Sequence, residues 1–217
     1  MKPYFETPLG KLYHGDCLEI MPELESVDLV LTDPPYGVNH AEWDSKYISI
    51  ENLLFEKSPS VLINCGDKNI ATCINAMGDK YKGMYYGWNM NGMTRGPLGY
   101  MNVIPVVCGG KLKRGMNFCK FSIQDLTRKN HPSPKPIEYY IEILLRFSEI
   151  NQLILDTFLG SGTTSVACER LKRRWIGIEK EEKYCEIAAK RIEENLTVME
   201  RIERSEKGIT KKTGLLF

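Results

Sequence analysis

An aspartate, two prolines and a tyrosine follow an apolar run near the start of the chain, as Asp33, Pro34, Pro35 and Tyr36. Each proline ring fixes its own backbone φ, and Pro34 also keeps Asp33 extended, so the Asp33 carboxylate and the Pro34 carbonyl become fixed acceptors. Two acceptors that bind both hydrogens of an aromatic amine would draw its delocalised lone pair into an attacking geometry. Tyr36 offers a flat face to the ring that carries the amine. The cluster indicates methyl transfer to an exocyclic amino group, with an ordinary proline turn as the structural alternative.

A second motif, rich in glycine and hydroxyl residues, follows the apolar residues 153 to 155. Its members are Asp156, Phe158, Gly160, Ser161, Gly162, Thr163 and Thr164. The following residues are apolar mainly at helical spacing, which predicts a strand, a glycine turn and a helix that starts at Thr163 or Thr164. Glycines allow a ligand to approach closely, and the first N–H groups of a helix attract anions. Glu179 ends the next apolar run, at about the 20-residue spacing that places an acid on ribose hydroxyls. An adenosine-containing cofactor is therefore expected.

Two rival interpretations of the glycine turn differ in spacing. A phosphate-binding loop of the G-x-x-x-x-G-K-[ST] type needs a lysine, and none follows Gly162, which disfavours nucleotide hydrolysis. A dinucleotide site needs a third glycine where this chain has Ser165. A nicotinamide-dependent dehydrogenase is thus a weakly supported alternative.

The pair of motifs, in this order, resembles the beta group of S-adenosyl-L-methionine-dependent DNA amino-methyltransferases, which act on adenine N6 or cytosine N4. In that group the catalytic tetrapeptide precedes the cofactor motif, a circular permutation of the usual order. Residues 131 to 136 resemble the H-P-x-x-K-P segment, which implies that Lys135 lines the methionine end of the cofactor pocket. Asp16 and Cys17 match the G-D-C turn, in which the acid holds the adenine amino group of the cofactor. The resemblance spans about residues 11 to 190.

An aspartate at the head of the tetrapeptide resembles adenine-specific members more than cytosine-specific ones, which frequently begin with serine. The expected reaction is site-directed methylation of adenine N6 in double-stranded DNA, on a base rotated out of the stack. Cytosine N4 is the alternative on DNA. An RNA base is a further alternative, because some RNA methylases share the tetrapeptide. A silent cofactor-binding module is disfavoured by the intact tetrapeptide, and the mechanism needs no metal.

Basic residues gather between residues 109 and 130, where larger members of the family carry a long target-recognition insertion. The predicted DNA contacts are Lys111, Lys113, Arg114 and Lys120 in that region, with His40 and Trp43 after the tetrapeptide. Lysine and arginine suit phosphate contacts, although a solvated loop and ordinary packing of Trp43 are the structural alternatives. So short a region favours modest specificity, assisted by a homodimer or a partner.

Seven segments are predicted as strands, namely residues 11 to 15, 28 to 32, 61 to 65, 84 to 88, 103 to 108, 152 to 156 and 174 to 179. Helices are predicted over residues 67 to 77 and 136 to 148, the latter with Pro136 in its first turn and Ile137, Tyr140, Ile141, Leu144 and Leu145 on one face. A charged helix follows residue 180, and the glycine-rich residues 87 to 102 are predicted as a mobile loop. The pattern predicts an α/β fold, a three-layer sandwich with a mostly parallel seven-stranded sheet. The resemblance implies the Rossmann-like S-adenosylmethionine methyltransferase fold, with the strand ending at Asp156 beside the one leading to Asp33.

Length and composition suit one globular domain over residues 1 to 217, with 42% apolar residues and a net charge of +1, and the resemblance implies that it is a methyltransferase domain. Seven cysteines without a C-x-x-C pair disfavour a disulfide framework and a structural zinc site. No apolar run has the length of a signal peptide or membrane span, so the expected location is the cytoplasm of a prokaryotic or virus-infected cell. Residues 203 to 217 form an expected flexible tail. Its apolar end resembles peptides that dock into a bacterial sliding clamp, with a solvated terminus as the alternative.

Overall fold

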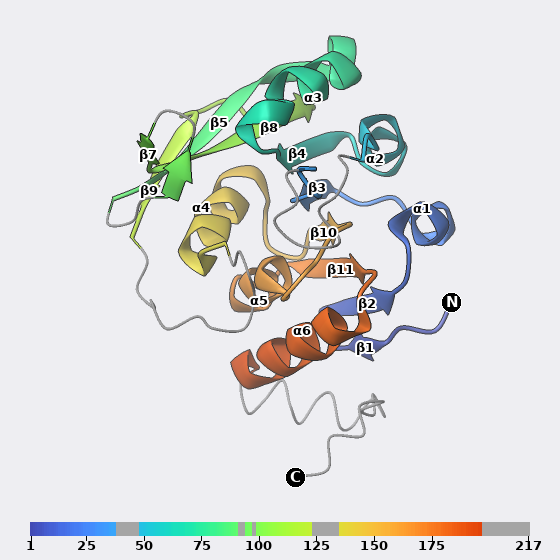
Figure 1. Ribbon diagram of the computed structural model, residues 1–217. Helices are drawn as coiled ribbons and strands as arrows, with labels where there is room; N and C mark the ends of the chain where they lie inside the picture. The colour runs from blue at the N-terminus through green and yellow to red at the C-terminus, as the bar shows by residue number, and fades with distance from the viewer. Residues whose placement is uncertain (38–47, 91–93, 97–98, 123–134, 197–217) are drawn as a thin grey trace.

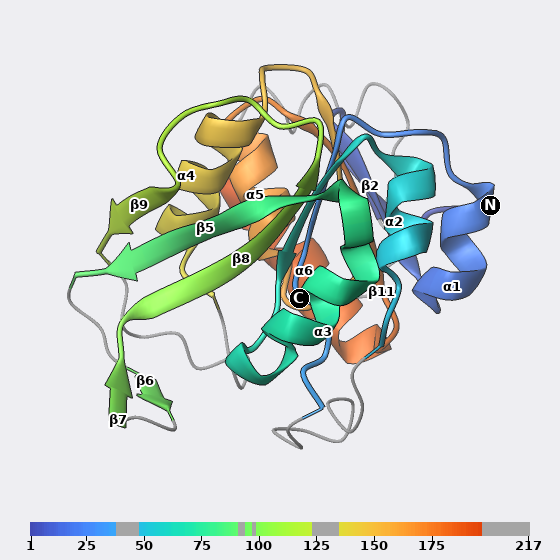
Figure 2. The same ribbon diagram turned by 90° about the horizontal axis from the view of Figure 1, so that it is seen from above.

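One sheet of nine strands forms the centre of the computed structural model, in the order β1–β2–β11–β10–β3–β4–β8–β5–β9 (Figure 1). The strands are β1 (Phe5–Glu6), β2 (Gly10–His14), β3 (Leu29–Thr32), β4 (Ser60–Asn64), β5 (Tyr81–Asn89), β8 (Val103–Gly110), β9 (Phe118–Phe121), β10 (Leu153–Asp156) and β11 (Arg174–Glu179). The structure describes residues 1–37, 48–90, 94–96, 99–122 and 135–196, and no side chains of residues 94–96 and 99–101. A separate hairpin, β6 (Thr94–Gly96) and β7 (Gly99–Met101), lies beyond the ends of β5 and β8 (Figure 2).

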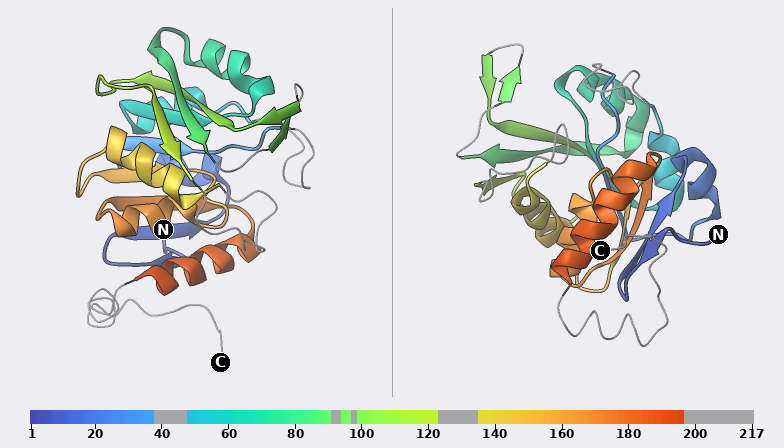
Figure 3. Two further views of the ribbon diagram at one scale, coloured as in Figure 1. Left: turned by 90° about the vertical axis from the view of Figure 1, so that its left-hand side faces the viewer. Right: turned by 60° about the horizontal axis from the view of Figure 1, so that its bottom comes forward.

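Helices cover both faces of the sheet (Figure 3). One face carries α1 (Cys17–Ile20), α2 (Glu51–Lys57) and α3 (Ile70–Met77), with the short 3₁₀ turns η1 (Met21–Glu23), η3 (Asp67–Asn69) and η4 (Gly78–Lys80). The other face carries α4 (Ile137–Phe147), α5 (Thr163–Arg170) and α6 (Glu182–Asn195). Alternate residues of one strand enter different cores, since Leu29 and Leu31 pack on the α4–α6 side and Val30 on the α1–α3 side. Burial on both faces explains why the strands are continuously apolar. The predicted three-layer α/β class is confirmed.

The five strands β2, β11, β10, β3 and β4 are parallel, whereas β8 is antiparallel to both of its neighbours. All seven predicted strands are present, but the predicted count of seven was too low, because β1 and β9 also join the sheet. β1 has only two residues, which is too short to produce a periodic signal. β9 alternates between exposed and buried side chains inside a segment whose charge suggested a loop.

Residues 87 to 102 are not the simple loop that their glycines suggested. They contain the end of β5, both strands of the β6–β7 hairpin and the point where the chain returns toward β8. At Gly87 an added Cβ would lie 2.3 Å from the ring of Tyr139. Glycine at this position therefore lets an aromatic ring of α4 lie against the sheet. Close packing, and not backbone mobility, explains the glycine.

The predicted helix at residues 136 to 148 is present as α4, with Pro136 at the N-cap instead of inside the first turn. Its buried face is rotated from the predicted one. Tyr139 and Ile143 are fully buried, and Leu145 is 54% exposed. The rotation arises because α4 packs against β9 and α5 as well as the central sheet.

The arrangement of the strands agrees with the permuted order that the resemblance implies. β2 from the start of the chain pairs with β11 near its end, and β10 pairs with β3 through Ile154 opposite Leu29. The strand ending at Asp156 thus lies beside the one leading to Asp33, as predicted. Among the described residues, no helix is long and apolar enough to cross a membrane. His40, Trp43 and the tail from residue 203 lie outside the described residues.

Candidate functional site

Four acidic residues stand at the carboxyl ends of four neighbouring parallel strands. Asp16 follows β2, Glu179 ends β11, Asp156 ends β10 and Asp33 follows β3, which is also the order of these strands in the sheet. We call this side of the sheet the carboxyl edge, and the opposite side the amino edge. Ligands of open α/β sheets bind at the carboxyl ends of the strands. Residues spread over most of the chain therefore meet along one edge.

Asp33, Tyr36 and Lys135 form a closed hydrogen-bonded triangle. The Tyr36 hydroxyl donates to Asp33 Oδ1, and the Lys135 ammonium donates to Asp33 Oδ2 and, at 2.8 Å, to the Tyr36 hydroxyl. The Asp33 and Lys135 side chains are both mostly buried. Lys135 was predicted to line the cofactor pocket, and the structure places its charge on Asp33 and Tyr36, two residues of the predicted catalytic tetrapeptide. The cofactor contact stays a prediction.

The Tyr36 ring is fixed by its surroundings. It packs on Gly66, where an added Cβ would lie 3.0 Å from the ring, and Asn69 Nδ2 donates to the Tyr36 carbonyl at 2.8 Å. Burial, followed by the neighbouring Asp33 carboxylate, raises the pKa of Tyr36 well above its usual value. Tyr36 is therefore a neutral phenol at physiological pH and can donate to Asp33.

A buried group of polar side chains lies between the end of β4 and α4. The Tyr139 hydroxyl donates to Asn64 Oδ1 at 2.5 Å, and Asn64 Nδ2 donates to the Tyr140 hydroxyl at 3.5 Å. Burial raises the pKa of both tyrosines well above the usual value, so both stay neutral. Tyr140 was predicted on the packed face of this helix, whereas Asn64 and Tyr139 were not identified from the sequence. The one available signal was Asn64, a polar residue at the end of an apolar strand.

Asp156 joins three elements. Its Oδ1 accepts from Thr32 Oγ1 and from the Phe158 N–H, each at 3.1 Å, and its Oδ2 accepts from Thr164 Oγ1 at 2.5 Å. The side chain is buried, and burial raises its pKa to about 7 against the opposing hydrogen bonds, of which that from Thr164 is the largest. Both oxygens of this predicted cofactor residue are therefore used inside the protein. They hold β3, β10 and α5 together.

The glycine turn between β10 and α5 adopts a conformation that favours glycine. Gly160 has a φ of 55° and Gly162 a φ of 82°, and an added Cβ at Gly162 would lie 3.0 Å from Ala188 of α6. Arg191 of α6, which the sequence analysis missed, donates to the carbonyl and hydroxyl oxygens of Ser161 at 2.6 Å each. The turn is thus held against α6. Ser161 and the predicted residues Thr163 and Thr164 are buried beneath it.

Glu179 supports the same turn from β11. Its Oε2 accepts from the Gly160 N–H at 2.7 Å and its Oε1 from the Glu181 N–H at 2.8 Å, while burial raises its pKa. A carboxylate can accept about four hydrogen bonds, so these two leave capacity for the ribose hydroxyls of a nucleoside. The predicted ribose contact is compatible with this geometry. Glu179 also has a structural task that the sequence did not show.

Asp16 and Cys17 lie at the other end of the edge. Asp16 caps α1 through the Leu18 N–H at 3.0 Å and pairs with Lys180 at 3.0 Å, and these contacts lower its pKa. Cys17 is buried, and burial raises the pKa of its thiol to about 12, which makes it a neutral packing residue. Asp16 supplies an acceptor suited to an amino group. Together with Glu179 and the glycine turn, it fits an adenosine cofactor.

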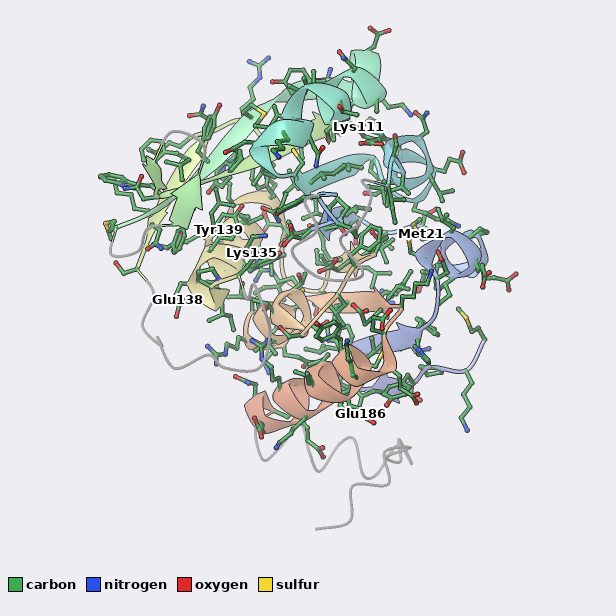
Figure 4. All side chains as sticks on the ribbon, in the orientation of Figure 1. Met21, Lys111, Lys135, Glu138, Tyr139 and Glu186 are labelled. Atoms are coloured by element: carbon green, nitrogen blue, oxygen red, sulfur yellow. The ribbon has the colours of Figure 1, made fainter. Side chains whose placement is uncertain are left out.

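The predicted DNA-contacting residues separate into two groups. Lys111 donates its backbone N–H to the Pro59 carbonyl at 2.8 Å, beside the first residue of β4, so it lies at the amino edge. Figure 4 shows Lys111 well separated from Lys135. Lys113 and Arg114 line the same groove as Lys111. Lys120 lies on β9, which runs parallel to β5 and therefore toward the carboxyl edge. Its ammonium is 5.2 Å from the ring of Trp88, which is 40% exposed. Lys120 is thus on a strand that runs toward the same edge as Asp33, four strands away from β3, and the other three residues lie at the amino edge.

Comparisons with known proteins agree with this geometry. A family model described as DNA methylase, for N6 and N4 methyltransferases, matches residues 107–190. The type II methyltransferase M2.LlaDCHI of Lactococcus lactis subsp. cremoris is 25% identical over 255 residues, covering 90% of this chain and 94% of the relative. The solved complex of M1.HpyAVI with SAM is 25% identical, with a TM-score of 0.66 over 84% of this chain and 99% of that one. The PvuII DNA methyltransferase, described as cytosine-N4-specific, is 21% identical and shares the fold, with a TM-score of 0.71 over 96% of this chain and 95% of that one.

Proposed function

We propose that this chain is an amino-methyltransferase of the N6/N4 family and that it methylates the N6 amino group of adenine in double-stranded DNA. S-adenosyl-L-methionine is the cofactor. The observation that supports the proposal best is the position of Asp33. Its mostly buried carboxylate follows β3, next to the strand whose glycine turn fits the cofactor.

S-adenosyl-L-methionine, when bound, supplies a methyl group that is activated by its positive sulfonium. Glu179 would hold its ribose, Asp16 its adenine amino group, and the turn from Phe158 to Thr163 would form the wall of the site. The acids along the carboxyl edge favour a positively charged ligand there. These assignments are proposals from the acceptor positions described above.

The protein's own contribution to the reaction is to activate the amine. Asp33 and the Pro34 carbonyl accept the two amino hydrogens, which weakens delocalisation of the nitrogen lone pair into the ring. As the new N–C bond forms and the bond between the methyl group and the sulfonium sulfur breaks, positive charge would develop on that nitrogen, and the Asp33 carboxylate would stabilise it. The proton leaves afterwards through the same hydrogen bond. Tyr36 and Lys135 fix the carboxylate before the base arrives, so little reorganisation is needed.

The target base must leave the helix for this to happen. Asp33 lies in a mostly buried position, and the amino nitrogen of a stacked base is not accessible to it. The Tyr36 ring, which packs on Gly66, provides a fixed surface for the rotated base. The proposal therefore includes base rotation as an obligatory step.

Cytosine N4 is the second candidate, because its amino group would make the same two hydrogen bonds. The PvuII enzyme, which shares the fold, is described as cytosine-N4-specific. The aspartate at position 33 favours adenine, by resemblance to adenine-specific members of the family. An RNA base would use the same chemistry on a different substrate.

The test is to incubate the protein with methyl-labelled S-adenosylmethionine and unmodified duplex DNA, and then to identify labelled nucleosides. We expect N6-methyladenine. N4-methylcytosine would retain the mechanism and correct the base. Label in RNA but not in DNA, with matched concentrations of both, would overturn the proposed substrate.

A further inference from the structure

A groove of about 580 Å³ opens at the amino edge, away from the catalytic tetrapeptide. It lies between the first half of β5, the end of β8, residues 111–117 and the last turn of α4. Five cationic side chains line it, namely Lys82, Lys111, Lys113, Arg114 and Arg146. None of the described residues that line it is acidic. The proposed reaction uses none of these cations.

The groove exists because the sheet is incomplete at this point. β9 pairs only with the second half of β5, from Tyr86 opposite Phe118 to Asn89 opposite Phe121. The edge of the first half of β5 is therefore bordered by residues 111–117, which return from β8 to the start of β9. The Tyr86 N–H donates to the Asn117 carbonyl at 2.9 Å where that return ends.

Two of the five cationic side chains in this groove have partners within the protein. Arg146 Nη2 donates to the Lys113 carbonyl at 2.6 Å and its Nε to the Met116 carbonyl at 3.3 Å, so its guanidinium is fixed against residues 111–117. The Lys113 ammonium pairs with Glu149, which offsets one charge. Lys82, Lys111 and Arg114 have exposed side chains on the rim. Positive charge held on a fixed frame suits phosphate groups, which arginine binds through paired N–H groups.

We propose that this groove binds the sugar-phosphate backbone of a second DNA segment while a first segment lies at the carboxyl edge. The inference rests on the proposed function, since it takes DNA as the substrate. Lys111 and Asp33 are about five residues apart along the strand direction, roughly 17 Å, and lie at opposite edges of the sheet. A straight duplex that lies across the carboxyl edge at Asp33 therefore does not cover the groove at the amino edge. When the carboxyl edge and the groove each hold a DNA segment, the protein transfers from one segment to the other without first dissociating into solution.

The experiment follows a fluorescein-labelled duplex as it leaves the protein. The preformed complex is mixed with increasing concentrations of the same duplex without label, and the release rate is read by anisotropy. Two sites allow the competitor to bind before the first duplex leaves, so we expect the rate to rise several-fold with competitor concentration. In K111E/R114E we expect a rate independent of competitor. The matched control is K11E/K190E, which makes the same charge change at exposed lysines of β2 and α6 and should behave as the wild type.

Each other result has a defined meaning. A release rate independent of competitor in the wild type overturns the inference, and the nucleoside assay then shows separately whether DNA methylation stands. If the release rate in K111E/R114E still rises with competitor concentration, the second DNA contact lies elsewhere on the protein and the groove is not the site. Binding of inorganic pyrophosphate is measured by calorimetry in the wild type and in K111E/R114E. If only the wild type binds pyrophosphate and the release rate of DNA does not depend on competitor, the groove is assigned to a small phosphorylated ligand and the inference is overturned. If the charge reversals prevent folding, K111Q/R114Q removes the same charges and gives the same readings.

Discussion

Asp33 and Asp156 lie at the ends of adjacent strands, yet their surroundings give them different tasks. Asp33 pairs with an ammonium and a phenol at the carboxyl edge, where a substrate can reach it. Asp156 is buried among hydroxyl and N–H donors and connects β3, β10 and α5. The first residue is available for chemistry, and the second holds the site together. Substitutions should separate these tasks.

Asp33→Ala should lower kcat by about a hundredfold or more, because the acceptor that activates the amine is lost. The affinity for S-adenosylmethionine, measured by calorimetry, should stay close to that of the wild type. Asp28→Asn, at the other end of β3, is the control and should retain turnover. Joint loss of turnover and cofactor binding would instead assign Asp33 to folding or to the cofactor.

Lys135→Met should lower kcat at saturating cofactor and DNA by about tenfold, because it removes the charged hydrogen bond that fixes Asp33. Lys135→Arg keeps the charge and should restore part of the rate. The affinity for S-adenosylmethionine, measured in parallel, separates the two roles of this residue. A weaker affinity with unchanged kcat at saturation would show that Lys135 serves the cofactor.

The pH dependence of stability should report the burial of Asp156. Its pKa rises from 3.8 in the unfolded chain to about 7 in the folded protein, so the folded state binds the proton more tightly. This contribution to stability is complete below pH 3.8 and is lost as the pH rises toward 7. Relative to Asp156→Asn, the free energy of unfolding of the wild type should fall by about 1.4 kcal/mol per pH unit within that window. Denaturant titrations at several pH values measure it, and parallel curves would contradict the assignment.

At the scale of elements, the glycine turn depends on α6 as much as on its own residues. The sequence motif ends at Thr164. Arg191, which lies in a different helix, holds the turn through hydrogen bonds to Ser161. A second link between α5 and α6, from Arg170 to Asn195, lies away from the turn. The two arginines therefore make matched tests of how α6 shapes the cofactor site.

Arg191→Met should weaken S-adenosylmethionine binding by about tenfold or more, because charged hydrogen bonds to the turn are lost. Arg170→Met should leave cofactor affinity close to that of the wild type, although it removes the exposed contact with Asn195. Calorimetric titration of both variants measures the difference. Equal losses would mean that packing of α6 in general, and not the contact with Ser161, supports the turn.

At the scale of the whole molecule, the direction of each strand decides which surface a residue joins. Lys111 and Lys120 are nine residues apart in the sequence. The chain reverses between them, so Lys111 lies at the amino edge and Lys120 on a strand that runs toward the carboxyl edge. A net charge of +1 says nothing of this separation. DNA contacts near the methylated base should therefore depend on Lys120.

Lys120→Glu should weaken binding of a short duplex and reduce the slope of log affinity against log salt by about 1, the change expected for one lost phosphate contact. Lys190→Glu, an exposed position on α6, is the control for net charge. Anisotropy titrations over a range of salt concentrations measure both variants. An unchanged slope in Lys120→Glu would place the DNA on a different part of the carboxyl edge.

The amino-acid sequence alone predicts the methyl-transfer chemistry and most of the helices and strands. Asp33 to Tyr36 and the turn from Asp156 to Thr164 follow apolar runs, and such local patterns fix strands, turns and helix starts through backbone geometry alone. The same patterns identified seven strands of the sheet. These local patterns failed at β9, which is a strand because it pairs with β5. They also failed at Gly87, where glycine is needed because the Tyr139 ring packs against it. In both cases the packing partner is distant in the chain.

The meeting of residues that are far apart in the chain could not be predicted before the fold was known. Strand order placed Asp33 and Asp156 side by side, and the approach of α4 brought Lys135 onto Asp33. Strand direction sent Lys111 and Lys120 toward opposite edges. These outcomes depend on contacts between segments far apart in the chain, and such contacts are set by burial on both faces of the sheet. No spacing within one segment encodes them.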